Sequence, residues 1–61
     1  MITKEQARSL AIAYGALNEA NNQGDNRSKA LWAESLLELQ RATGVVLHSE
    51  WVLKHCISLA D

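Results

Sequence analysis

The stretch that decides the fold is residues 26–43, which read NRSKALWAESLLELQRAT. Apolar side chains recur there at three- and four-residue spacing around Trp32, Leu36 and Leu39, a pattern typical of an amphipathic α-helix. Placed around a helix, the apolar arc covers well over half of the circumference. Such a helix needs neighbours on two sides, so we predict that it is the central element and that Trp32 lies in the core.

The ends and the polar side of this segment agree with that prediction. Asp25 or Asn26 can cap its start, and Gly44 can supply the left-handed residue that ends it. The polar side carries Glu38 and Arg41, whose spacing suits an ion pair on a helix surface.

The preceding segment predicts a first helix over residues 4–22. Thr3 and Gln6 have the spacing of a capping box, and an apolar stripe follows that includes Leu10, Tyr14 and Leu17. The polar residues from 21 to 26 then predict a loop. A short loop between two helices favours an antiparallel hairpin.

The last segment predicts a third, shorter helix over residues 48–60. Ser49 is a plausible N-cap, and residues 52, 53, 56, 57 and 60 form an apolar face. Residues 45–47 are either an extended link or the first turn of this helix. A strand over residues 45–53 is disfavoured because the sequence offers no second strand for it to pair with.

Length and composition limit the architecture. The chain has 61 residues, 48% of them hydrophobic, a net charge of −1 and no proline. This composition excludes a disordered chain, and no apolar run is long enough to span a membrane. We therefore predict one all-α domain over residues 1–61, a helical hairpin plus a shorter C-terminal helix. Since the sequence starts with Met1, we expect the whole product of a short gene.

A domain of this size has a marginal core and usually needs extra stabilisation. Cys56 is the only cysteine and cannot form an internal disulfide, and no secretory leader pattern is present, so we expect a cytoplasmic protein. His48, Glu50, His55 and Cys56 have ligand chemistry, but neither CxxC nor HxxxH occurs. We expect no metal and no cofactor, and we predict that a homodimeric helical bundle supplies the stabilisation.

Catalysis has no support in the sequence. There is no nucleophile motif and no glycine-rich phosphate loop, and each acidic residue can be explained as surface or helix-end charge. A bundle of this size also has little room for an ordinary substrate pocket. We expect that the protein is not an enzyme.

Partner binding is the function that the sequence favours. In a helix from 48 to 60, Trp51 falls on the polar side with Lys54 and His55, and large exposed aromatic residues are typical interface anchors. The alternative is that Trp51 closes the core against Leu47. Ile12 likewise points away from the core stripe of the first helix, as a lone exposed residue or as a contact to a second chain. The candidate partner-binding residues are Trp51, His55, Lys54, Leu47 and Ile12.

Ala7, Ala11 and Gly15 lie four residues apart on the first helix. Small residues at this spacing let another helix approach closely, although tolerated drift at an exposed position explains them equally well.

Nucleic-acid binding is the alternative. Among the basic residues only Arg27 and Lys29 cluster, and the others are interleaved with acidic residues over all three helices. In outline, a short helical hairpin that dimerises resembles the Rop type of four-helix bundle, a family of RNA-binding regulators. The resemblance concerns architecture alone, because none of that family's basic RNA-facing positions is matched and the third helix departs from it.

The sequence therefore predicts a non-enzymatic helical interaction module, such as an adaptor, inhibitor or regulator. Its length is typical of accessory proteins of phages and other mobile elements. The alternative is a small nucleic-acid-binding regulator of the dimeric hairpin type.

Overall fold

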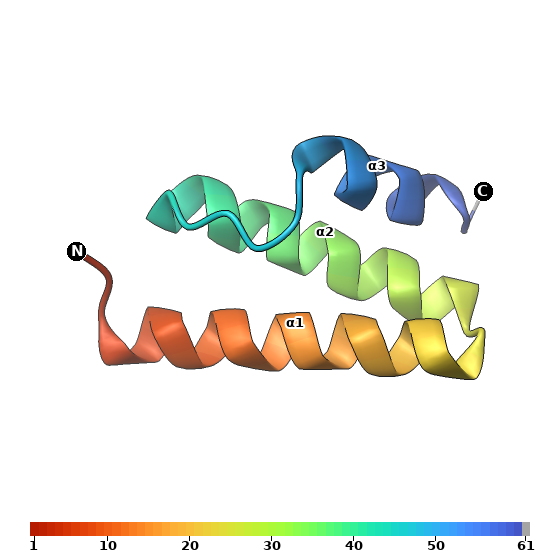
Figure 1. Cartoon of the computed structure of the whole chain (residues 1–61), viewed down its shortest axis with the longest axis horizontal. Coiled ribbons are helices and arrows are strands. Elements are labelled where there is room, and N and C mark those ends of the chain that lie inside the picture. The colour runs from red at the N-terminus through yellow and green to blue at the C-terminus, as the bar shows by residue number, and fades with distance from the viewer. Residues whose placement is uncertain (61) are drawn as a thin grey trace.

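The computed structural model describes residues 1–60 and contains three α-helices in this part of the chain, with no strand (Figure 1). They are α1 (Lys4–Gln23), α2 (Asn26–Thr43) and α3 (Glu50–Ser58). The predicted all-α fold is confirmed, and the bounds of α1 and α2 lie within one residue of those predicted.

Local signals in the sequence explain where α1 and α2 begin and end. The capping box is present: Thr3 Oγ1 accepts from the Gln6 N–H at 3.0 Å, and Gln6 Oε1 accepts from the Thr3 N–H at 2.9 Å. Gly24 and Gly44 end the two helices at φ values of 69° and 77°, in the left-handed region that favours glycine.

The cap of α2 also explains a titration property. The Asp25 carboxylate accepts hydrogen bonds from the backbone N–H and the hydroxyl of Ser28. These bonds stabilise the ionised form, so they lower the pKa of Asp25 from its ordinary value.

The third helix is shorter than the predicted range of 48–60. Ser49 caps it as expected, with its hydroxyl accepting from the Val52 N–H at 3.3 Å, so the helix begins at Glu50. His48 lies outside the helix because both its backbone N–H and its C=O bond to the side chain of Gln40. The two histidines therefore do not share a helical face, which they would if the helix began before His48.

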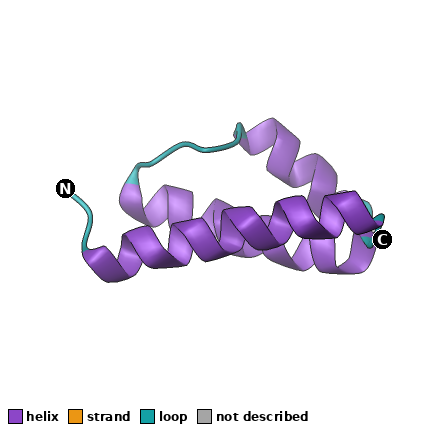
Figure 2. Cartoon of the chain, turned by 60° about the horizontal axis from the view of Figure 1, so that its bottom comes forward, coloured by secondary structure: helices purple, strands orange, loops and turns teal. Residues whose placement is uncertain are grey.

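The helix α2 lies between the other two and packs against both (Figure 1). It runs antiparallel to α1 as a hairpin, and the link of residues 44–49 leads back so that α3 packs along α2 (Figure 2). The core is the set of buried apolar residues shared by the three helices, namely Leu10, Ala13, Leu17, Ala33, Leu36, Leu37, Leu53 and Cys56. The central position predicted for residues 26–43 is thus confirmed.

Two details of α2 differ from prediction. Trp32 lies at the edge of the core: it packs against the buried residues but is only partly buried, because no residue of α3 lines the groove on its side of α2. Arg41 does not pair with Glu38 on its own helix but with Glu50, which the link brings back beside it.

Within residues 1–60, none of the helices combines the length and the hydrophobicity that a membrane-spanning helix requires.

Candidate interaction surfaces

Trp51 is the most exposed aromatic residue of the described chain, with 77% of its surface open to solvent. Its ring stacks on that of His55, one helical turn later, with centroids 6.1 Å apart and planes 10° apart. The alternative in which Trp51 closes the core against Leu47 is therefore wrong. We call this exposed stacked pair on α3 the Trp51–His55 plate.

Glu50, the first residue of α3, forms exposed ion pairs with Arg41 and Lys54. Glu50 accepts from Arg41 Nε at 2.8 Å, and its second oxygen lies 3.6 Å from Lys54 Nζ. The Arg41 hydrogen bond and charge lower the pKa of Glu50 from its ordinary value, and Lys54 adds to this effect. Lys54 is thus already paired within the chain, so a partner that binds Lys54 competes with Glu50 for it.

The link before α3 is held by a buried side chain. Gln40, which is 6% exposed, accepts from the backbone N–H groups of Leu47 (2.6 Å) and His48 (2.9 Å) and donates to the His48 carbonyl at 2.9 Å. Both polar atoms of this amide, Oε1 and Nε2, therefore form hydrogen bonds. The link turns back along α2 with Val46 and Leu47 exposed at 73% and 42%.

Val46 is an apolar surface residue that the sequence analysis did not single out. The available signal was the run of three apolar residues directly after the helix-ending Gly44. Such a run cannot be buried entirely when it forms a short link at the edge of a small core.

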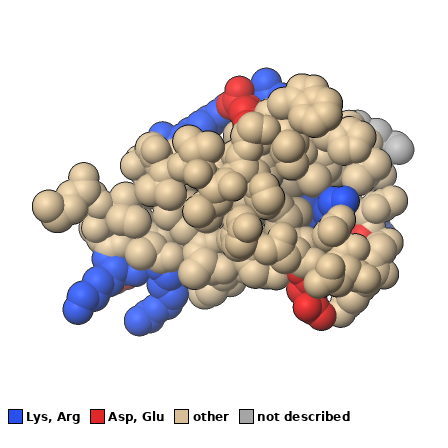
Figure 3. Space-filling model, viewed as in Figure 1, with Lys and Arg blue, Asp and Glu red and all other residues tan. Residues whose placement is uncertain are grey.

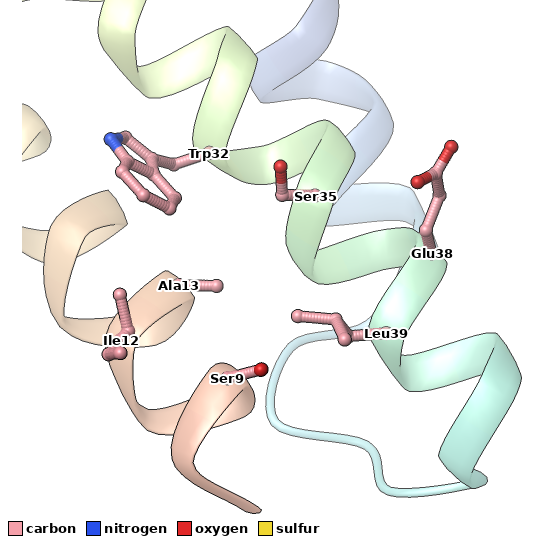
Figure 4. Close-up of a pocket in the computed structure, with 7 residues that line it drawn as sticks. All are labelled: Ser9, Ile12, Ala13, Trp32, Ser35, Glu38 and Leu39. Atoms are coloured by element: carbon pink, nitrogen blue, oxygen red, sulfur yellow. The ribbon is translucent and has the colours of Figure 1, made fainter. Parts of the chain in front are cut away.

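Ile12 lies apart from these residues, on a surface formed by α1 and α2. It is 55% exposed and stands at the side of an open groove of about 350 Å³ between the two helices (Figure 4). The groove is lined by Ser9, Ile12, Ala13, Trp32, Ser35, Glu38 and Leu39. Trp32 was predicted to be core, and the groove that it lines with Leu39 was not predicted.

The structure does not bring Arg27 and Lys29 into one basic patch. Arg27 lines a hollow beside the C-terminal end of α3, together with Leu31 and Glu34. Lys29 faces the other way and donates to Asn21 Oδ1 at 2.7 Å. Residues two apart on a helix project in nearly opposite directions, so the pair offers no common surface to a phosphate backbone.

The histidines line a groove of about 230 Å³ between α1 and α3. His48 stacks on Tyr14 with centroids 5.1 Å apart, and buried Cys56 contributes to the apolar floor. The polar side chains around it are imidazoles, amides and the Lys29 ammonium, with no carboxylate among them. Nowhere in the part of the chain that the structure describes do three or more His, Cys, Asp or Glu side chains form a group that could hold a metal ion.

Comparison of the chain with models of protein families, with curated proteins and with solved structures found no match.

Proposed function

We propose that this protein is a non-enzymatic protein-interaction module that acts in the cytoplasm as a small adaptor, inhibitor or regulator. In this proposal the chain forms a homodimer through one surface and presents the Trp51–His55 plate to a different protein. The candidate contacts are Trp51, His55, Lys54 and Leu47 on the plate side and Ile12 on the dimer side.

The exposure of Trp51 is the observation that carries the proposal. An indole that is 77% exposed holds a large apolar area in water, and a partner that covers it gains by removing that area. His55 restricts the ring by stacking on it, so less rotamer entropy is lost on binding. Exposed Leu47 and Val46 add apolar surface in the link directly before α3.

A second observation supports separate surfaces for the dimer contact and the partner contact. The groove beside Ile12 is lined only by α1 and α2, whereas the plate belongs to α3. A dimer contact at the groove therefore leaves the plate free for another protein.

The test compares Trp51→Ala with Leu31→Ala, an exposed apolar residue on α2 that belongs to neither surface. Each tagged variant is purified from cells after crosslinking, and the bound proteins are quantified by mass spectrometry. Trp51→Ala should lower the affinity for the partner by about 30-fold or more, as expected for an aromatic hot spot that contributes about 2 kcal/mol. Leu31→Ala should retain it.

Both variants should melt close to the wild-type temperature, because neither side chain is buried. The proposal is wrong if Trp51→Ala captures the same proteins in the same amounts as the wild type. Sedimentation of Trp51→Ala separates the two surfaces, since the proposal expects its self-association to be unchanged.

A further inference from the structure

The groove between α1 and α2 is a largely uncharged surface hollow. Six of its seven lining residues are uncharged, namely Ser9, Ile12, Ala13, Trp32, Ser35 and Leu39. Figure 4 shows Ile12 and Trp32 on opposite walls of the groove, with α3 behind α2. An open apolar groove with small residues on both walls fits another helix.

The charge along α1 indicates what that helix is. Residues 9–18 carry no charged side chain, while Lys4, Glu5 and Arg8 give the N-terminal end of the helix a net positive charge and Glu19 lies near the other end. Figure 3 shows basic side chains at the N-terminal end of α1 and acidic ones towards its opposite end. A helix with this distribution is complementary to a second copy of itself in the antiparallel direction.

The charges on this face also lack opposite charges of their own. Within residues 1–60, neither Arg8 nor Glu19 forms an ion pair, and Glu19 accepts a hydrogen bond only from the amide of Gln23. Both side chains are exposed and lie within one side of α1, next to Ile12. They are therefore free to pair across an interface.

We propose that the groove is covered by the same groove of a second copy, with the two α1 helices antiparallel and Arg8 of each copy paired with Glu19 of the other. This inference rests on the homodimer of the proposed function and specifies its surface and register. Because Ile12 lies four residues after Arg8 and Gly15 four before Glu19, the register brings Ile12 over the turn that contains Gly15 and Ala16 of the second copy.

The helix surface at that turn permits close approach. A Cβ atom built on Gly15 would meet nothing within 4 Å, so the space above it is open. Ala16 beside it is also small, which leaves room for the Ile12 side chain. The packing is reciprocal, as a two-fold axis requires.

The area available is adequate for a dimer. Two helices of about 30 Å by 10 Å each give the hairpin face a projected area of about 600 Å². Interdigitating side chains bury more than the projection, which approaches the roughly 800 Å² per partner of a standard interface. That would cover about a fifth of the 4302 Å² that the chain exposes.

Charge reversal tests the register. The dissociation constant of the dimer is measured by sedimentation for the wild type, Arg8→Glu, Glu19→Arg and the double variant. Each single reversal opposes two like charges and should weaken the dimer about tenfold or more, whereas the double variant should return to within about threefold of the wild type. Ile12→Glu should be monomeric at every concentration tested.

Matched controls keep failure of folding separate from failure of assembly. Helix content and melting temperature are recorded for each variant, and Arg27→Glu reverses an exposed charge away from the groove and should leave the dissociation constant unchanged. Combining Arg8→Glu with Glu38→Arg tests the competing arrangement, in which α1 lies over α2 of the second copy.

The outcomes separate this inference from the proposal on which it rests. A wild-type chain that sediments only as a monomer would refute the homodimer together with its register. If the wild type dimerises and Arg8→Glu leaves the dimer intact, the register is refuted and the homodimer stands. The same holds if Glu38→Arg, and not Glu19→Arg, restores dimerisation of the Arg8→Glu variant.

Discussion

Substitution of the buried Gln40 by methionine should destabilise the protein, although it replaces a polar side chain in the apolar arc of α2 by an apolar one. Methionine has nearly the same volume and keeps the helix propensity, so no cavity forms and α2 itself is not weakened. What is lost is the set of three hydrogen bonds from one amide to the backbone of Leu47 and His48, at 2.6 to 2.9 Å.

The size of the effect follows from those bonds. Each is worth about 1 kcal/mol net, and water replaces part of the loss because Leu47 is 42% exposed, so we expect about 2–3 kcal/mol. A chain of this length has a total stability of about 3–9 kcal/mol. The melting temperature should fall by about 10–20 °C.

The assay is urea and thermal unfolding followed by circular dichroism, with Gln23→Met as the matched control. Gln23 is exposed and bonds only to Glu19 on the same helix, so its loss should cost less than about 0.5 kcal/mol. Amide hydrogen exchange should show that α3 and residues 44–49 lose more protection than α1. A stability for Gln40→Met within about 0.5 kcal/mol of the wild type would refute the reasoning.

Three further predictions concern other elements. Gly44→Ala should lower the unfolding free energy by about 1 kcal/mol, because φ is 77° there and the cost comes from the backbone alone; an unchanged urea midpoint would contradict it. Leu36→Ala should lower the free energy of unfolding by about 2–5 kcal/mol, because Leu36 of α2 is fully buried in the core. Circular dichroism should then show a largely unfolded chain at 37 °C, and a cooperative transition near the wild-type temperature would count against the core described above. Because the pKa of Glu50 is lowered below its ordinary value of 4.5, its contribution to stability is complete above that pH and is lost as the pH falls through the lowered pKa. Glu50→Gln should therefore reduce the urea midpoint at neutral pH and match the wild type in strong acid. A difference that persists in strong acid would disprove this linkage.

Features that depend on neighbouring residues in the sequence could be predicted. The capping box at Thr3 and the helix-ending Gly44 are local, and both were found where the sequence placed them. The buried stripe of α1 and the central place of α2 follow from helical periodicity.

Features that depend on the path of the chain could not be predicted. A broad apolar arc on α2 does not show which part of it a short third helix covers. Trp32 was therefore assigned to the core, whereas it lies at the edge of the core and lines a groove. The preference of Arg41 for Glu50 over Glu38 likewise depends on the link, which brings together residues nine positions apart.

The candidate interaction surfaces could likewise be predicted only in part, because they also depend on the path of the chain. Periodicity placed Trp51 on the polar side of its helix but left open a different start, and only the Ser49 cap settles that it points outward. Ile12 and Trp51 were grouped as partner contacts because both point away from an apolar stripe. The structure places them on separate surfaces, since Ile12 lines a groove formed by α1 and α2 alone and Trp51 is exposed on α3.

Gln40 is the residue that connects these observations. A polar residue in the apolar arc of α2 would be read from the sequence as a small defect, yet its amide determines where the link runs. By holding His48 against α2, it directs α3 along that helix and away from the side on which Trp32 lies. The buried Gln40 amide thus leaves one face of the hairpin open, while the Trp51–His55 plate points outward from α3. Loss of Gln40 should therefore disturb the plate before it disturbs the groove.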